Sequence, residues 1–403
     1  MESHRAWAEV DLGALTHNLR LVRAVAGAGT RVLLVVKADA YGLGAVAIAR
    51  HALRAGVGAL GVGTATEALE LRAAGITAPI LLLGTTVESE LAPCLREEVH
   101  VALQDVETAD RLGDLARKLC VRAHVHLNVD TGMGRLGVLP DQVETALDAI
   151  GAGGHVHLAG LMTHVADPRG WSPATEEQVA TLGRACEQVR ARGPWGGWVH
   201  AYNSATLFTA PRPFGDTVRV GLAALGGLEL PGGKAPALAP VLSLRSQVAL
   251  VRTVPSGTPV GYGSDWVARR PSRIATLPIG YADGLPRALS GRGEVLLHGH
   301  RAPIVGRISM DYTTVDVTDL PPIAPGDRAT LVGRCGEEEL AVGEVARAAG
   351  TIAYELTCGL GPRIPRLARA ADESIVPSQP PRPSIHEARS APCDPVSTPP
   401  PHG

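Results

Sequence analysis

Val32-Leu33-Leu34-Val35-Val36 is a run of five apolar residues that ends at Lys37. An unbroken apolar run of this length is typical of a strand buried on both faces of a parallel sheet. Seven more such runs follow, with helix-period segments between several of them: Ala59–Val62, Pro79–Leu83, Val99–Leu103, Ala123–Val129, His157–Met162, Trp198–Ala201 and Thr217–Val220. Eight strand–helix repeats in roughly 200 residues predict a (β/α)8 barrel of the TIM type rather than an open doubly wound sheet.

The sequence pattern changes after about residue 240. Helical periodicity fades, and β-rich stretches recur between glycine and proline turns: Leu242–Val254, Arg273–Ile279, Glu294–Leu297, Thr313–Val317 and Arg328–Val332, with one helix-like segment, Val342–Ala349. We therefore expect a barrel domain over 1–238, a mostly β C-terminal domain over 239–370 and a disordered tail over 371–403, which holds nine of the 31 prolines. Ahead of the barrel, Ala8–Val22 is compatible with a helix that returns to pack on the second domain.

The composition excludes several classes of function. Lys and Arg total 38 against 40 Asp and Glu, a net charge of −2, which argues against a nucleic-acid partner. No apolar run approaches the roughly 18–20 residues that span a bilayer, and the N-terminus opens no signal-peptide stretch. The six cysteines are scattered without a C-x-x-C pair, which suits neither a disulfide scaffold nor a zinc site. We expect a cytoplasmic globular protein without a membrane partner.

Lys37 is the first candidate for chemistry. It is one of only three lysines, and it follows the first predicted strand, at the barrel face where active sites lie. One interpretation is a lysine whose long stem simply extends from the barrel mouth. The other is an amine kept partly dry, with a lowered pKa, that forms a Schiff base. The scarcity of lysine favours the second interpretation.

The sequence around Lys37 resembles a known motif. Val36-Lys37-Ala38-Asp39-Ala40-Tyr41-Gly42-Leu43-Gly44 is similar to the pyridoxal-phosphate lysine motif of the alanine racemase family, of fold type III. The resemblance continues in order from about residue 6 to 368. The matching motifs are Trp7-Ala8-Glu9-Val10-Asp11-Leu12, Asp130-Thr131-Gly132-Met133-Gly134-Arg135-Leu136-Gly137, Met162-Thr163-His164, Asn203-Ser204-Ala205, Val260-Gly261-Tyr262-Gly263, Pro278-Ile279-Gly280-Tyr281-Ala282-Asp283-Gly284, Val305-Gly306-Arg307-Ile308-Ser309-Met310-Asp311 and Pro362-Arg363-Ile364-Pro365-Arg366.

The resemblance implies racemisation of alanine with pyridoxal 5′-phosphate as cofactor. Moving the α-proton of an amino acid from one face to the other needs two bases on opposite faces. By resemblance, Lys37 anchors the cofactor and serves the D-enantiomer, and Tyr262 serves the L-enantiomer. In the family this tyrosine comes from the other subunit, so a homodimer with shared active sites is implied. Without the resemblance, Tyr262 also reads as a turn tyrosine between two glycines.

The other site residues are carried over from the same motifs. The implied cofactor contacts are Lys37, Tyr41, His164, Ser204, Arg219, Gly221, Leu222 and Tyr354. The implied substrate contacts are Arg135, Met310, Asp311 and Tyr281, the last at the entrance of the site. Taken singly, Ser204 is equally compatible with a surface serine and His164 with a structural histidine. The pairs His124/His126 and His155/His157 lack a completing ligand set, so we expect no metal site.

Arg219 has a physical consequence of its own, because the resemblance sets it against the pyridine nitrogen. An arginine has a pKa above about 12 and does not give up its proton. The ring nitrogen then stays neutral, the electron sink is weaker, and side transamination is disfavoured. A clamp for a phosphate or carboxylate is the alternative role.

Two features depart from familiar patterns. Gly132-x-Gly134-x-x-Gly137 fits the dinucleotide fingerprint, but Val138-Leu139-Pro140 follows where a helix should begin, which disfavours that interpretation.

Asn128 occupies a position where many family members carry a carbamylated lysine. We expect a small anion such as chloride between Asn128 and Arg135.

The predicted function is therefore interconversion of L- and D-alanine, supplying D-alanine for peptidoglycan. Asn128 keeps open a serine or broad-specificity racemase on the same scaffold. A related decarboxylase fits less well, because Tyr262 and Met310-Asp311 belong to the racemase pattern. A non-catalytic pyridoxal-phosphate-holding protein is disfavoured by the second domain.

Overall fold

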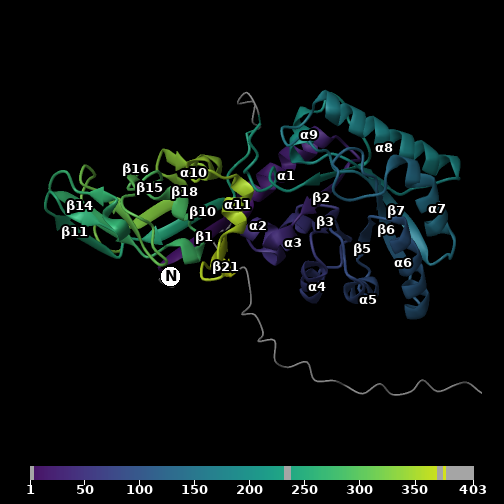
Figure 1. The fold of residues 1–403 in the computed structure, drawn as a ribbon, viewed down its shortest axis with the longest axis horizontal. Coiled ribbons are helices and arrows are strands. Elements are labelled where there is room, and N and C mark those ends of the chain that lie inside the picture. Colours follow the sequence, from purple (N-terminus) through teal and green to yellow (C-terminus); the bar gives the residue numbers. More distant parts are fainter. Residues whose placement is uncertain (1–3, 231–236, 370–374, 378–403) are drawn as a thin grey trace, which may run out of the picture.

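The computed structural model describes residues 4–230 and 237–369, and the backbone of 375–377. Figure 1 shows an elongated molecule in which a barrel ringed by helices lies at one end and a β-rich domain at the other. The helix α11 (Ala353–Cys358) and the segment α2 (Lys37–Gly42) meet where the two parts join.

Eight parallel strands form the barrel, as predicted. They are β2 (Arg31–Val35), β3 (Ala59–Val62), β4 (Ile80–Leu82), β5 (His100–Leu103), β6 (Ala123–Asn128), β7 (Val156–Met162), β8 (Trp198–His200) and β9 (Thr217–Val220). Strand β2 pairs with both β3 and β9. No regular ladder joins β8 to β9, but the amides of Asp216 and Arg219 donate to the carbonyls of Val199 and Tyr202, which nearly closes the ring.

Helices on the outside cover the apolar faces of these strands. They are α3 (Ala45–Arg54), α4 (Ala65–Ala73), α5 (Glu88–Arg96), α6 (Val106–Leu119), α7 (Val143–Gly151), α8 (Pro173–Ala191) and α9 (Ser204–Thr209). Several begin at the residues that sequence rules favour. Thr64 and Glu67 form a capping box on α4, and Ser172 caps α8 with Pro173 in its first turn.

The second domain is mostly β, as predicted. Its large sheet contains β1 (Ala6–Asp11), β10 (Leu242–Gln247), β15 (Glu294–Leu297), β16 (His300–Pro303), β18 (Arg328–Cys335), β19 (Glu338–Leu340), β20 (Arg366–Arg369) and β21 (Ile375–Pro377). A three-stranded sheet contains β11 (Leu250–Val254), β14 (Ser272–Leu277) and β17 (Thr313–Asp316), and β12 (Pro259–Val260) pairs with β13 (Trp266–Val267). The helix α10 (Val342–Ala348) fits the predicted helical segment.

The N-terminal segment differs from its prediction. The expected helix over Ala8–Val22 begins only at Leu12, as α1 (Leu12–Ala26), and the residues before it form β1. Strand β1 pairs antiparallel with β10 and parallel with β20, so it is a central strand of the second domain's sheet. Four of the five residues in Ala6-Trp7-Ala8-Glu9-Val10 are apolar, a pattern that does not distinguish a helix from a strand, and its strand partners lie more than 230 residues away.

The tail also differs in part. Ile375–Pro377, within the predicted disordered segment 371–403, forms β21 and pairs antiparallel with β20. The remaining residues of that segment lie outside the described part of the chain.

The segment α2 is a left-handed turn rather than an ordinary helix. Ala38, Asp39, Ala40 and Tyr41 have φ values of 52°, 55°, 51° and 57°. Each such residue costs roughly 1–2 kcal/mol relative to the right-handed form, so the surroundings must hold the turn in place. A side chain at Gly42 would overlap the carbonyl oxygen of Thr357 in α11, so the turn is packed tightly against the second domain.

Candidate active site

A cleft of about 720 Å³ opens at the carboxyl ends of the barrel strands. This volume suits a small-molecule site. Nine predicted site residues line it: Lys37, Tyr41, Arg135, His164, Ser204, Arg219, Gly221, Leu222 and Tyr354. Tyr354 comes from α11 of the second domain, so both domains of the chain build this cleft.

Lys37 stands two residues after the last residue of β2, at the start of the left-handed turn. The carboxylate of Glu67 accepts hydrogen bonds from the amides of Ala38 at 2.6 Å and Gly63 at 2.7 Å. This bridge ties the residue after Lys37 to the loop after β3. The Lys37 side chain is exposed in the single chain, so the dry surroundings expected from the sequence are not provided by this chain alone.

Arg219 lies deep in the cleft and is only 5% exposed. Its guanidinium donates to the carbonyl oxygens of Thr163 and His200, both at 2.8 Å, and to Nδ1 of His200 at 3.0 Å and of His164 at 3.3 Å. Burial lowers the pKa of Arg219 to about 10, which still leaves it charged at neutral pH. Burial, and then the charge of Arg219, lowers the pKa of His164 to about 3, so this imidazole is neutral.

Ser204, Gly221 and two tyrosines form a group of neutral hydrogen-bond donors. Ser204 Oγ accepts from the amides of Gly221 and Ala223, both at 3.2 Å. A side chain at Gly221 would overlap the hydroxyl of Tyr41, and the rings of Tyr41 and Tyr354 lie 5.6 Å apart. Burial raises the pKa of both phenols, so each keeps its O–H as a donor.

The glycine-rich loop after β6 presents Arg135 to the cleft. Asp130 Oδ1 accepts from the amides of Gly132, Met133 and Gly134 at 2.8–3.1 Å. Burial opposes the ionised form, but these amide bonds hold the pKa of Asp130 below its ordinary value. The loop ends at Val138, which forms an isolated bridge with Val129 just after β6, and α7 begins only at Val143. The glycines therefore do not open a helix as a dinucleotide site requires.

Asn128 lies at the end of β6, beside this loop. Its Nδ2 donates to Oε1 of Gln104 at 2.7 Å and to the carbonyl of Leu136 at 3.0 Å. Its Oδ1 is buried and has no hydrogen-bond partner.

Four predicted residues do not line this cleft: Tyr262, Tyr281, Met310 and Asp311. All four lie in the β-rich domain, and Tyr262 is 71% exposed and Met310 52%. Tyr262 stands between Gly261 and Gly263, whose φ values of 79° and 74° explain the need for glycine at both places. The single chain therefore holds the predicted site in two separate halves.

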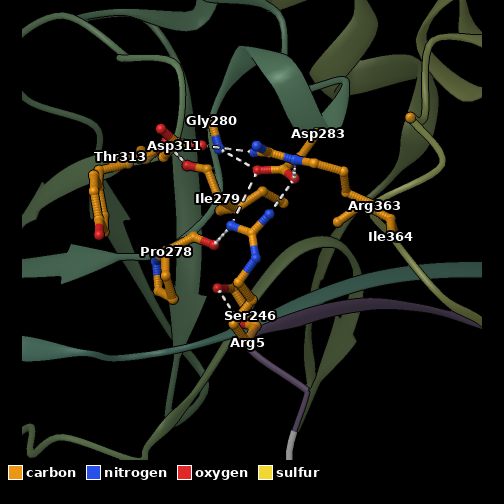
Figure 2. A network of polar contacts seen from close by, with 12 residues as sticks. Arg5, Ser246, Pro278, Ile279, Gly280, Asp283, Asp311, Thr313, Arg363 and Ile364 are labelled. Atoms are coloured by element: carbon orange, nitrogen blue, oxygen red, sulfur yellow. Dashed lines mark hydrogen bonds and ion pairs between the residues drawn. The ribbon is translucent and has the colours of Figure 1, made fainter.

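An ionic network around the buried Asp283 joins the segments that carry Tyr281 and Asp311 (Figure 2). Asp283, which is fully buried, accepts from Nη2 of Arg5 at 2.6 Å and from Nε of Arg363 at 2.9 Å. Its other oxygen accepts from the amide of Gly280 at 3.0 Å, and Arg363 also reaches Asp311 at 2.8 Å. Burial disfavours the charge, but Arg363, the Gly280 amide and Arg5 hold the pKa of Asp283 below its ordinary value.

Two contact residues were missed by sequence reasoning. Glu67 forms the capping box of α4, but nothing in the local sequence indicates its hydrogen bond to the amide of Ala38. His200 lies in a predicted strand, and its contact with Arg219 required the order of the strands in space. Within the described residues, no cluster of three or more His, Cys, Asp or Glu side chains is arranged to hold a metal ion, and no helix is long and apolar enough to cross a membrane.

Family models match both domains of the chain. A family model described as alanine racemase, N-terminal domain, matches residues 10–229, and one described as alanine racemase, C-terminal domain, matches residues 241–368. The chain belongs to the alanine racemase family. The expected family and the barrel-plus-β fold are confirmed, and the chain is an isomerase, as predicted.

Curated relatives in the alanine racemase family cover nearly the whole chain. The alanine racemase of Symbiobacterium thermophilum is 42% identical over 363 residues, which are 89% of this chain and 96% of that protein. The alanine racemase of Desulfovibrio desulfuricans is 41% identical over 365 residues, 90% of this chain and 97% of that protein. These relatives support racemisation of alanine as the activity.

Solved alanine racemase structures superpose on both domains. The Bacillus anthracis enzyme with bound L-Ala-P has a TM-score of 0.87 at 31% identity, covering 94% of this chain and 98% of that one. The Bartonella henselae enzyme, with covalently bound pyridoxal phosphate, has a TM-score of 0.81 at 32% identity, covering 91% and 100%.

Proposed function

We propose that this chain is a pyridoxal-phosphate-dependent alanine racemase that uses Lys37 and Tyr262 as its two bases. The observation that carries the proposal is the placement of Lys37 and Arg219 in one cleft with the hydroxyl and amide group around Ser204. That combination offers an amine, a buried cation and a set of neutral donors at the carboxyl face of a barrel.

The cleft fits the cofactor at three points. The hydroxyls of Tyr41, Ser204 and Tyr354 and the amides near Gly221 and Leu222 would hold its phosphate. The absence of a side chain at Gly221 lets the hydroxyl of Tyr41 approach this backbone closely. Arg219 would donate to its ring nitrogen beside the neutral His164, and Lys37 would bond to its aldehyde carbon. The bound cofactor acidifies the α-proton of the amino acid by delocalising the resulting charge.

The two bases would act from opposite faces and from different subunits. Lys37 Nζ would exchange the proton on one face, and Tyr262 of the partner subunit would exchange it on the other. Tyr262, Tyr281, Met310 and Tyr312 are all large, apolar and exposed in the single chain, which supports a homodimer that covers them. The partner's surface would also cover Lys37, which is exposed here.

The substrate carboxylate would lie between Arg135 and the partner's Met310-Asp311 segment, with Tyr281 at the entrance. A narrow entrance at Tyr281 would favour a small side chain such as that of alanine. We further propose that the reaction takes place in the cytoplasm and supplies D-alanine for peptidoglycan. We also propose that the boundary between the barrel domain and the β-rich domain lies at residue 238.

For Asn128 we propose the small-anion site between its amide and Arg135. Because Nδ2 now faces Gln104 and Leu136, the amide must turn to donate to the anion. We expect chloride to lower the KM for alanine relative to gluconate at equal ionic strength, because a fixed Arg135 binds the carboxylate better. Steady-state kinetics with the two salts checks this, and equal KM values would contradict it.

Chiral product analysis tests the proposed function. The holoenzyme is offered L-alanine, L-serine and a panel of larger L-amino acids, and the D-products are separated and quantified. We expect fast formation of D-alanine and slow turnover of the others. Comparable turnover of serine or larger substrates would establish the broad-specificity alternative that Asn128 keeps open. A protein that binds pyridoxal phosphate but racemises none of these amino acids would overturn the proposal.

A further inference from the structure

Three histidines form a continuous hydrogen-bonded line that ends on Arg219. His100 Nδ1 lies 3.0 Å from His126 Nε2, and His126 Nδ1 lies 2.8 Å from His200 Nε2. His200 Nδ1 lies 3.0 Å from Nη1 of Arg219. His100 opens β5, whereas Arg219 lies in the cleft, so the line runs through the barrel from its amino-terminal end to the candidate active site. We call His100, His126 and His200 the histidine line.

The backbone of β7 is shaped to let this line pass. The pairing of β6 with β7 shifts register after Val125, so that His126 pairs with Gly160. A side chain at position 160 would overlap the ring of His126. A bulge and a glycine at one point of a strand are features that admit a close approach by another group. The bond between His126 and His200, which crosses from β6 to β8, thus depends on a local departure from regular strand geometry.

Arg219 dictates where each proton of the line must lie. A guanidinium has only donors, so Nδ1 of His200 must accept. A neutral imidazole carries one N–H, so His200 donates from Nε2 to Nδ1 of His126. His126 then donates from Nε2 to Nδ1 of His100, and His100 carries its own proton on Nε2. All three histidines of the line are therefore the tautomer that is protonated on Nε2.

The surroundings keep these rings neutral. His126 and His200 are fully buried, and burial, followed by the positive charge of neighbouring groups, holds the pKa of both far below the ordinary value. The same causes lower the pKa of His100 to about 4. A second proton on any ring would set two donors against each other within the line.

Arg219 depends on neutral acceptors for its orientation. Its contacts are the carbonyl oxygens of Thr163, His200 and Ala201 and the Nδ1 atoms of His164 and His200. No carboxylate within the described residues forms an ion pair with it. If His200 turned or changed tautomer, one of these acceptors would become a donor and the guanidinium would have to move.

We propose that His126 and His100 are positioning residues that hold His200 as an acceptor, and through it fix the direction in which Arg219 presents its N–H groups to the cleft. They do so by satisfying the buried Nε2–H of His200 and carrying the chain of donors out to the end of the barrel. That these N–H groups would meet the ring nitrogen of the cofactor rests on the proposed function. The tautomers of the three histidines do not depend on it.

The tautomers can be measured without cofactor or activity. Side-chain nitrogen NMR spectra of protein labelled with 15N in its histidines, assigned by single substitutions, report which ring nitrogen carries the proton. We expect His100, His126 and His200 to be protonated on Nε2 alone. A His200 protonated on Nδ1 would overturn the proposal, whether or not the protein racemises anything.

Substitutions then test the positioning role. His126→Leu removes the acceptor for His200, whereas His126→Asn keeps an amide oxygen near the position of Nδ1. His124→Leu is the matched control, because His124 stacks on His100 at 5.0 Å and has no bond in the line. We expect His126→Leu to change the His200 nitrogen signals and lower kcat about tenfold with KM within about twofold. His126→Asn should restore much of the wild-type kcat and of the wild-type His200 signals. His124→Leu should change neither.

Side transamination gives a further readout, the pyruvate formed per racemisation cycle, which we expect to rise in His126→Leu. If that variant does not fold, His100→Leu at the half-buried end of the line is expected to shift the His126 signals. Unchanged His200 signals in His126→Leu, with kcat no lower than in His124→Leu, would overturn the proposal. A wild-type holoenzyme with the expected tautomers but without racemase activity would instead refute the proposed function.

Discussion

Glu67 shows how one side chain can support a strained segment from outside it. The four left-handed residues after Lys37 include no glycine, so the turn is held by its contacts rather than by its own preference. Glu67 supplies one of the strongest of these contacts, since its carboxylate bridges the amides of Ala38 and Gly63. The same side chain closes the capping box on α4. One carboxylate therefore serves both a helix end and the backbone beside the proposed base.

The two roles of Glu67 are separable by substitution. Glu67→Ala removes both, whereas Thr64→Ala removes only the cap and is expected to cost about 1 kcal/mol. We expect Glu67→Ala to cost about 2 kcal/mol and to lower kcat at least tenfold, because the amide of Ala38 loses its acceptor. Urea unfolding and steady-state kinetics measure the two quantities. Equal kcat values in the two variants would contradict a role for Glu67 beyond capping.

For single residues, the sequence predicts the kind of role that a side chain has better than it predicts which residues that side chain contacts. Lys37 stood out because lysine is scarce in this chain, whereas Arg219 was identified through the family resemblance. The bond from Glu67 to Ala38 could not be predicted, because it depends on a left-handed turn that the sequence Ala38-Asp39-Ala40-Tyr41 does not favour. The unpartnered Oδ1 of Asn128 was also beyond sequence reasoning.

The irregularity of strand β7 makes room for a side chain in the barrel interior. Its register shift sets Gly160 beside the His126 ring, and no other residue fits there without displacing that ring. The eight barrel strands were predictable because burial on both faces leaves continuous apolar runs. The bulge was not, since it inserts one residue into a run that remains apolar. Strand β1 was mistaken for helix because its pairing is set by distant strands and not by its own pattern.

Gly160→Ala tests the packing of β7. We expect it to destabilise the protein by about 2 kcal/mol, because the new methyl group must displace the His126 ring in a close-packed core. Gly153→Ala, whose methyl group would meet open space, is the matched control and should change stability by less than about 0.5 kcal/mol. Thermal or urea unfolding gives both values. Equal stability of the two variants would show that the His126 ring moves freely.

The whole molecule divides the proposed site between two surfaces that a single chain does not bring together. The cleft holds Lys37 and Arg219, whereas Tyr262 lies in the β-rich domain and does not line the cleft. The resemblance implied this division from the sequence, but periodicity and spacing could not, since they describe one chain. The described fold therefore supports a dimer without containing one.

Mixing two inactive variants tests the shared site. Lys37→Ala and Tyr262→Phe should each lose nearly all racemisation as homodimers. In a mixed dimer, one site combines an intact Lys37 with an intact Tyr262, and the other site lacks both. We expect an equimolar mixture, dissociated and reassociated, to recover about a quarter of the wild-type sites. Activity no greater than that of the separate variants would contradict sites shared between subunits.

Neutral buried histidines predict how stability depends on pH. Burial lowers the pKa of His100 to about 4 and of His164 to about 3, and holds those of His126 and His200 far below the ordinary value. Below about pH 6.5 the unfolded chain binds a proton at each of these sites and the folded chain does not, so stability falls as the pH falls. Each histidine contributes a slope of up to about 1.4 kcal/mol per pH unit.

Urea unfolding of the cofactor-free protein at pH 7.5, 6.5 and 5.5 measures this slope. We expect the free energy of unfolding to be lowest at pH 5.5. His126→Asn should reduce the slope of this free energy against pH by the equivalent of about one bound proton. Buried carboxylates such as Asp283 lose their contribution only below about pH 4, outside this range. Equal stability at pH 7.5 and 5.5 would contradict neutral histidines in the folded protein.

The position of β1 between β10 and β20 has a consequence for biosynthesis. The first strand leaves the ribosome early, but its antiparallel partner is made more than 230 residues later and its parallel partner near residue 366. During that interval the nascent chain carries a strand without neighbours, while the barrel that follows it completes its own sheet. The β-rich domain is thus the last of the two to assemble, because its sheet can close around β1 only after β20 has been synthesised.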